Sequence, residues 1–350
     1  MGVHRQLTPD NMNRIKLILL QILFVASISV GYADNTDVGT TGNAALKIGV
    51  GARATAMGDT FVAVADDVNT IYWNPSGLGL LERPQFSAMH AEWLADIRYE
   101  WLGFAQSLGR WVAIGADAAL VHTEDIPHTI ASSAGGFERD GTFNYNNLII
   151  RLAAGSGVYK GIRVGAAFQI SQQAVDFSST KQPVLKKQVR GNSLHLGVIY
   201  QPQRIQNLRL GASLQNIGSD IEAFFDQPSP LPKILRIGGA YTIAIQPAIR
   251  AVQDEKAPTP KQLAAQNRLI LAWDFNFQSE LPANLHTGVE YLFSNGLAFR
   301  FGYRGGSDLD FLSRLSGGIC YATDTYQIDY AFVPYGDLGE THRVSFTLGF

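Results

Sequence analysis

The chain has 350 residues, of which 17% are charged, whereas soluble domains usually have about 25%. A formal net charge of -2 provides no basic surface for nucleic acid, so we expect no nucleic-acid partner. The single cysteine, Cys320, excludes an intrachain disulfide and a metal site built from several cysteines. With 46% hydrophobic and 11% aromatic residues, the composition favours β-strands, which could bury a soluble core or cross a membrane.

Residues 1–33 have the organisation of a secretory signal peptide. Arg14 and Lys16 precede a mostly apolar run at 17–30, and small residues lead up to Ala33, where we expect cleavage. An uncleaved membrane anchor is the alternative, but the run is shorter than the ~20 apolar residues that a spanning helix needs. The sequence therefore predicts export.

Beyond residue 84, bulky apolar residues alternate with glycine, charged or other polar residues at period two, which is typical of strands with two different faces. Fourteen such segments occur, at 85–93, 98–108, 111–122, 144–156, 161–172, 192–201, 207–216, 233–244, 267–276, 284–292, 297–304, 313–321, 325–333 and 341–350. An even number of strands of ~9–11 residues is what an outer-membrane barrel requires. A soluble β-sandwich would also alternate, but glycine and arginine opposite aromatic residues favour a wet lumen inside and lipid outside. We predict an all-β, 14-stranded antiparallel transmembrane barrel at 85–350, located in the bacterial outer membrane.

The connections between these segments support the barrel. Short turns at 109–110, 159–160, 294–296 and 323–324 alternate with long, polar outer loops at 123–143, 173–191 and 217–232. The stretch 245–266 is an exception, because it would be a long inner connection. The last strand ends in Phe350, which resembles the signal that barrel assembly machinery recognises. We expect this machinery and outer-membrane lipid as partners.

A block of small and polar residues lies between the signal and the first strand. Its distinctive residues are Gly51, Arg53, Met57, Gly58, Asp66, Asp67, Trp73, Asn74, Pro75 and Gly77. In these residues it resembles the PorV/PorQ family of outer-membrane proteins, which is related to the FadL-type transporters of hydrophobic compounds. The resemblance implies that residues 34–84 fold inside the barrel as a plug. An irregular lumenal segment agrees with Pro75, which cannot donate a ladder hydrogen bond, and with Asn74 and Gly77, which favour turns.

Other chemistry receives little support. Gly49, Gly51 and Ala54 fit a dinucleotide fingerprint, but no alternating strands and helices follow, so we expect no cofactor. Asp66 and Asp67 are adjacent and outside any calcium-loop pattern. A second group could bind a metal or form a solvated loop: His122, Glu124, Asp125 and His128. Because the sequence has no nucleophile elbow and no zinc-protease motif, we predict that the chain is not an enzyme.

Charged residues recur on the face assigned to the lumen. They are Arg151, Arg163, Arg209, Arg236, Arg268, Arg300, Arg304, Arg314, Arg343, Asp117, Asp274, Glu290 and Asp329. Because buried charges need partners, we expect them to pair with each other and with the plug, although a path for anions is an alternative. A second set could form an apolar outer rim that contacts a ligand or a partner protein: Phe224, Phe225, Pro228, Pro230 and Leu231.

The resemblance leaves two functions open. PorV-like proteins bind and escort secreted cargo bearing a C-terminal signal domain in type IX secretion, which implies cargo proteins and secretion-system subunits as partners. FadL-like proteins transport long-chain fatty acids or other hydrophobic compounds. Paired charges in the lumen would favour the escort role, whereas apolar lumenal pockets would favour the transporter.

Overall fold

The computed structural model describes residues 39–109, 111–133, 135–179, 186–221, 228–245, 266–306 and 310–350. The expected signal peptide, Phe224, Phe225 and nearly all of the 245–266 connection lie outside these ranges. No helix within them is long and apolar enough to cross a membrane.

In the described ranges, antiparallel strands form one closed barrel. The strands are β1 (Gln85–Glu92), β2 (Arg98–Ser107), β3 (Val112–His122), β4 (Ile126–Ala131), β5 (Phe137–Tyr159), β6 (Ile162–Ser178), β7 (Lys186–Tyr200), β8 (Leu208–Ile217), β9 (Ile234–Ile245), β10 (Asn267–Gln278), β11 (Leu281–Leu292), β12 (Leu297–Arg304), β13 (Leu315–Ala322), β14 (Tyr326–Pro334) and β15 (Glu340–Gly349). The pairings β1–β15 and β3–β5 close the ring. Strand β4 extends β5 beyond the end of β3, so the wall itself has fourteen strands and the predicted fold is confirmed.

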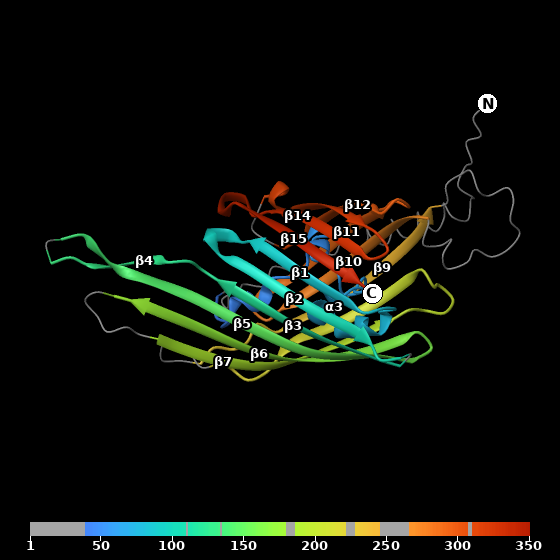
Figure 1. The fold of residues 1–350 in the computed structure, drawn as a ribbon, viewed down its shortest axis with the longest axis horizontal. Coiled ribbons are helices and arrows are strands. Elements are labelled where there is room, and N and C mark those ends of the chain that lie inside the picture. The colour runs from blue at the N-terminus through green and yellow to red at the C-terminus, as the bar shows by residue number, and fades with distance from the viewer. Residues whose placement is uncertain are drawn as a thin grey trace, which may run out of the picture.

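The wall is tall on one side and low on the other (Figure 1). Strands β5, β6 and β7 have 23, 17 and 15 residues, whereas β12 and β13 have 8 each. The tall strands occupy much of the sequence that was expected to form the outer loops 123–143 and 173–191. Above the membrane neither face of a strand meets lipid, so the apolar alternation that reveals a strand disappears there.

The polarity of the wall is inverted relative to a soluble protein. Outward side chains such as Leu102, Phe168 and Phe301 are 51%, 47% and 61% exposed, while inward Arg151 and Glu290 are buried. An apolar exterior around a polar interior is the pattern of a barrel that spans the outer membrane.

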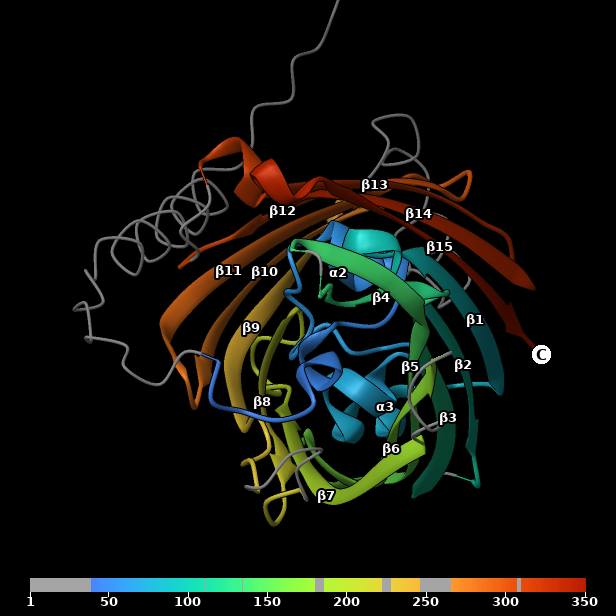
Figure 2. The same ribbon diagram turned by 90° about the vertical axis from the view of Figure 1, so that its left-hand side faces the viewer.

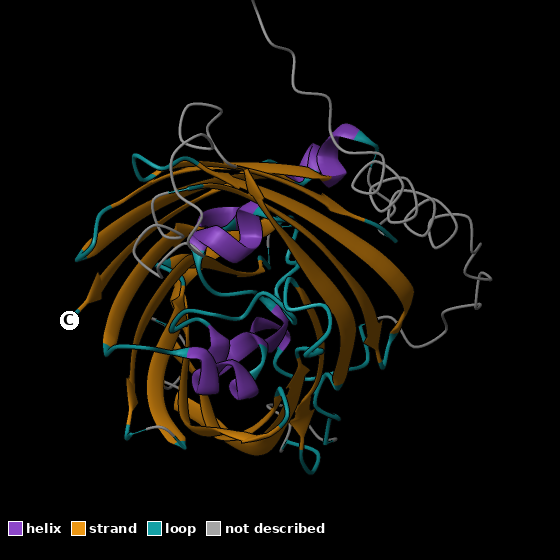
Figure 3. Cartoon of the chain, turned by 90° about the vertical axis from the view of Figure 1, so that its right-hand side faces the viewer, coloured by secondary structure: helices purple, strands orange, loops and turns teal. Residues whose placement is uncertain are grey.

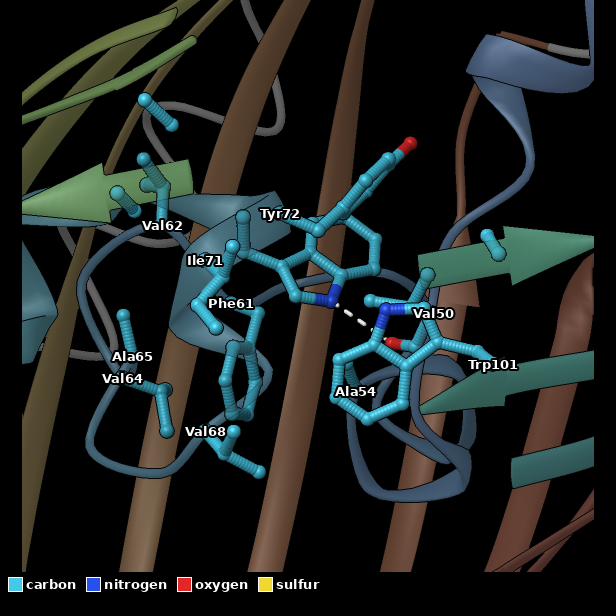
Figure 4. Close-up of a cluster of buried hydrophobic side chains, with 14 of the residues drawn as sticks. Val50, Ala54, Phe61, Val62, Val64, Ala65, Val68, Ile71, Tyr72 and Trp101 are labelled. Carbon is cyan, nitrogen blue, oxygen red and sulfur yellow. Dashed lines mark hydrogen bonds between the residues drawn. The ribbon is translucent and has the colours of Figure 1, made fainter. Parts of the chain in front are cut away.

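Residues 39–84 occupy the lumen (Figures 2 and 3). They form the short helices η1 (Ala44–Lys47), α2 (Ala52–Ala56), α3 (Thr70–Trp73) and η2 (Pro75–Leu80). The largest apolar cluster lies between this segment and the wall, where Phe61, Ile71 and Trp101 converge (Figure 4). The core of the protein is therefore inside the barrel, and we call residues 39–84 the plug.

Candidate functional site

The first half of the plug is bound to the wall by charges. Arg53 on α2 donates from Nε and Nη2 to the two carboxylate oxygens of Glu290 on β11, at 2.8 and 2.9 Å. Its Nη1 donates to Asp66 at 2.7 Å and to Asp67 at 3.0 Å, both within the plug. One guanidinium thus joins three carboxylates, and such bidentate pairs have a fixed geometry as well as charge.

This group continues along the wall in both directions. Glu290 also accepts from Arg300 Nε on β12 at 2.5 Å, and Arg300 Nη1 donates to Asp329 on β14 at 2.6 Å. On the other side, Arg209 on β8 contacts Asp66 at 3.2 Å. We call the six residues Arg209, Asp66, Arg53, Glu290, Arg300 and Asp329 the charge ladder. Every charge in it has an opposite partner, as burial requires.

Wall side chains also bind the backbone of the plug. Asp274 on β10 accepts from the backbone amides of Phe61 and Val62 at 2.8 and 2.9 Å. Ser345 Oγ on β15 accepts from the amide of Ala52 at 2.9 Å, next to the charge ladder's Arg53. Irregular backbone has amides without a secondary-structure partner, and these side chains satisfy them.

Both halves of the plug fit against glycines of the wall; in the first half, a Cβ at Gly302 on β12 would lie 1.9 Å from Gly58 N. The second half is held in this way at its Asn-Pro turn. A Cβ at Gly165 on β6 would lie 2.3 Å from the carbonyl carbon of Pro75, and one at Gly197 on β7 would lie 2.0 Å from Asn74 Oδ1. Asn74 Nδ2 donates to Val62 O at 2.7 Å and to Val198 O at 3.2 Å, and its Oδ1 accepts from Ser76 Oγ at 2.7 Å. The Asn-Pro turn is therefore held by steric fit and by neutral hydrogen bonds.

The other motif residues have structural roles around these two halves. Gly51 and Gly58 have φ values of 82° and 69°, a conformation that glycine adopts without strain. The indole of Trp73 donates to Val50 O at 2.9 Å, and the Arg236 guanidinium lies 4.9 Å from its ring. A Cβ at Gly77 would be 2.0 Å from Ala65 O. Met57 is fully buried.

Several further predicted lumen charges also lie inside. Arg151 donates to both oxygens of Asp117 at 2.9 and 3.0 Å. Arg343 Nη1 donates to Gly49 O at 2.5 Å, and Arg163 Nε to Gly79 O at 3.3 Å. Arg304 Nη2 donates to Pro334 O at 2.9 Å.

Two predicted lumen charges lie elsewhere. Arg268 is exposed near the inner end of β10. Arg314 was predicted to lie in the strand 313–321, but it is on the short helix η4 (Leu312–Arg314), because β13 begins only at Leu315. Its Nη1 lies 3.4 Å from the outward Tyr303 hydroxyl. Arg314 therefore does not belong to the charge ladder.

Sequence reasoning missed a set of buried amide side chains. Gln169 bridges Arg151 and Ser193, at 2.8 and 2.9 Å, and Gln215 accepts a hydrogen bond from Arg236. Their inward position on alternating strands was the available signal, but an uncharged amide is not distinctive in a sequence.

The predicted outer rim differs from the structure. Leu231 is only 2% exposed, because it packs inward beside Gly218, whereas Pro230 is exposed and its carbonyl accepts from the plug amide of Gly42 at 2.9 Å. No group of three or more His, Cys, Asp or Glu in the described chain could hold a metal ion. Glu124 instead pairs with Arg98 at 2.5 Å. At the inner end, the Phe350 amide donates to Pro84 O at 3.1 Å.

The tall side of the wall carries aromatic residues on its inner face. Phe143 of β5 and Phe177 of β6 are cross-strand partners whose rings stack at 5.5 Å, and the His128 ring lies 5.8 Å from Phe177. Tyr145 follows on the same face, and then Asn147, which donates to Asn43 of the plug at 2.6 Å. The rings of Phe143, Tyr145 and Phe177 are half-buried. We call Phe143, Phe177 and His128 the mouth cluster, because it lies beyond the plug at the outer end.

The sequence and fold have relatives among known proteins. The model of the Uncharacterised protein family (UPF0164) matches residues 24–229. The fold resembles the toluene transporter TbuX of Ralstonia pickettii, with 16% identity, a TM-score of 0.55, and coverage of 86% of this chain and 98% of TbuX. It also resembles the toluene transporter TodX of Pseudomonas putida, with 13% identity, a TM-score of 0.55, and coverage of 86% and 97%. No curated protein matches the sequence. At these identities the likeness shows that the chain shares the barrel fold of these two transporters, and the FadL-type and PorV/PorQ relationships stay predictions.

Proposed function

The chain belongs to the Uncharacterised protein family (UPF0164), and we propose that it transports apolar small molecules across the outer membrane by a shift of its plug. The mouth cluster carries this proposal. Stacked Phe143 and Phe177 present aromatic surface toward the barrel axis, beyond the plug, where an apolar molecule from outside would arrive first. Binding there removes apolar surface of the ligand from water, which is favourable and needs no charged partner.

The plug supplies the barrier that such a transporter needs. It fills the lumen at membrane depth, and its first half is bound by the charge ladder. Both halves fit closely against wall glycines, as Gly58 does against Gly302 and Pro75 against Gly165. Only the first half also depends on the charge ladder, whose contacts can exchange partners with water when a segment moves. The proposal is therefore that the first half, with α2, moves and opens a path, while the Asn74–Pro75 turn stays in place.

Uptake measurements test the proposal. Cells that lack the protein would be complemented with the wild type or with Phe143→Ser/Phe177→Ser, and uptake of radiolabelled toluene and oleate would be followed. We expect uptake at low probe concentration to fall about 10-fold in the variant, since aromatic contacts contribute about 0.5–1.5 kcal/mol each. Phe137→Ser is the matched control, because Phe137 is 80% exposed at the tip of the tall wall. Equal uptake by deletion strain and wild type would refute the transport function.

The escort role in type IX secretion is the second candidate. The fully paired charge ladder supports it, because a lumen lined by paired charges at membrane depth offers little apolar surface for a small ligand. Its test is the secreted and surface proteome of a strain lacking the protein. Loss of many proteins that share a C-terminal signal domain would favour the escort role, and an unchanged proteome would exclude it.

A further inference from the structure

The low side of the wall is short for a membrane crossing. Strand β12 has 8 residues, and at about 3.4 Å per residue it is roughly 27 Å long. A tilt of about 40° reduces the height to roughly 20 Å, less than the apolar band of about 25 Å that such barrels present. The outer connection between β12 and β13 therefore begins near the depth of the lipid headgroups or within the acyl region.

That connection contains a short helix with a fixed orientation. Asp310 accepts from the Ser313 amide at 3.0 Å and from Ser313 Oγ at 2.8 Å, and these hydrogen bonds lower the pKa of the Asp310 carboxyl. Ser313 is buried, and its carbonyl accepts from Arg304 at 3.4 Å. Because Ser313 is held on the inner side of η4, the preceding residues point away from the protein.

The residues that point away are apolar. Phe311 is 66% exposed and Leu312 is 71% exposed, although both are large hydrophobic side chains. The Phe311 ring lies 5.9 Å from the ring of Tyr303, which belongs to the outward face of β12 with Phe299 and Phe301. The exposed side chains of η4 are thus continuous with the lipid-facing exterior of the barrel.

We propose that η4 is an interfacial anchor, in which Phe311 and Leu312 insert into the outer leaflet of the membrane. The neighbouring polar groups fit the headgroup level. Tyr303 has its hydroxyl 3.4 Å from Arg314 Nη1, and aromatic rings with a polar end collect at this boundary, while arginine extends toward headgroup oxygen atoms. The partner is the lipid surface itself, so this inference does not depend on which molecule the barrel transports.

Site-directed spin labelling in liposomes tests the anchor with lipid as the only partner present. In a Cys320→Ala background, a nitroxide would be attached to Leu312→Cys, to Phe301→Cys as a lipid-facing reference, and to Phe137→Cys as a reference in water. We expect the label at 312 to collide more often with oxygen than with a nickel chelate, as at 301, and the label at 137 to show the opposite order. A label at 312 as accessible to the nickel chelate as the label at 137 would overturn the proposal.

A second variant separates orientation from general exposure. Asp310→Ala removes the acceptor for both Ser313 donors, so η4 should lose its fixed orientation. We expect the label at 312 to become more mobile and at least 3-fold more accessible to the nickel chelate. Heat-dependent gel migration would verify that every labelled variant forms the barrel. Unchanged accessibility in Asp310→Ala would contradict the role of Asp310 in orienting the anchor.

Discussion

The two halves of the plug share a close fit against wall glycines but differ in their use of charge. The first half, around α2, depends on Arg53 and the charge ladder, in which each ion needs its partner. The second half, around the Asn74–Pro75 turn, depends on the absence of side chains at Gly165 and Gly197. An added methyl group would disturb either half, since a Cβ at Gly302 on β12 would lie 1.9 Å from Gly58 N of the first half. Removal of one charge would disturb only the first half. The comparison favours movement of the first half, because water entering an opening can solvate the charges that its ion pairs release.

The largest expected effect is that of Arg53→Gln. This change removes the cation that three carboxylates share. Glu290 keeps Arg300 and Asp66 keeps Arg209, but Asp67 loses its ion pair, and breaking a buried pair usually costs about 3–5 kcal/mol. We expect the plug to leave its place while the wall still forms. The measurement is sensitivity to a large antibiotic that the outer membrane normally excludes, together with heat-dependent gel migration. Wild-type resistance in Arg53→Gln would show that the ladder does not hold the plug.

Gly165→Ala tests the second half. Its Cβ would lie 2.3 Å from the Pro75 carbonyl carbon, and backbone cannot yield as a flexible side chain can. Overpacking of this kind costs about 1–3 kcal/mol, measurable by urea unfolding in detergent micelles. Gly157→Ala on the neighbouring strand β5 is the matched control, because a Cβ there meets nothing within 4 Å. Equal stability of the two variants would remove the steric argument.

A smaller effect concerns the beginning of the plug, where Thr41 and Lys47 donate to Glu280 in the β10–β11 turn. Burial alone would raise the pKa of Glu280. The hydrogen bonds from Lys47 and Thr41 and the charge of Lys47 together have the larger, opposite effect, so the pKa lies below its ordinary value of 4.5. A carboxyl with a lowered pKa stabilises the folded state at pH values above its ordinary pKa. This stabilisation is lost as the pH falls through the pKa of the folded state. Glu280→Gln should therefore cost about 1 kcal/mol at pH 7, after solvent screening, and less at pH 3.5. Urea unfolding at both pH values measures the difference, and a pH-independent cost would contradict the assignment.

The smallest effect is expected at Arg98. Its ion pair with Glu124 at 2.5 Å resembles one rung of the charge ladder, but the two side chains are 47% and 68% exposed. An exposed pair contributes about 0–1 kcal/mol, so Arg98→Gln should change the free energy of unfolding by less than about 1 kcal/mol. If Arg98→Gln destabilised the protein as much as Arg53→Gln, burial would not be the reason that the charge ladder contributes more to stability than an exposed ion pair.

The sequence was sufficient to predict the membrane-spanning parts of the fourteen wall strands, because lipid requires one apolar face on each of them. It was insufficient for β4 and the upper parts of β5 to β7, where both faces meet water. In the plug, the family resemblance singled out Arg53. Its contact with Glu290 depends on which wall strand faces α2 in the folded barrel, and the sequence pattern does not specify this. Gln169 and Gln215 could not be singled out, because the sequence does not distinguish a glutamine that will be buried from one that will be exposed. Leu231 was expected to be exposed because its loop has an apolar and proline-rich composition, yet the structure places it inside.

The central claim is that the first half of the plug must move for uptake. It can be tested by a disulfide between Ala52→Cys and Ser345→Cys in a Cys320→Ala background, since these two residues are in direct contact, with the Ala52 amide 2.9 Å from Ser345 Oγ. We expect oxidised cells to take up labelled toluene or oleate no faster than the deletion strain, and we expect reduction to restore uptake. Equal uptake by the oxidised and the reduced form would contradict it.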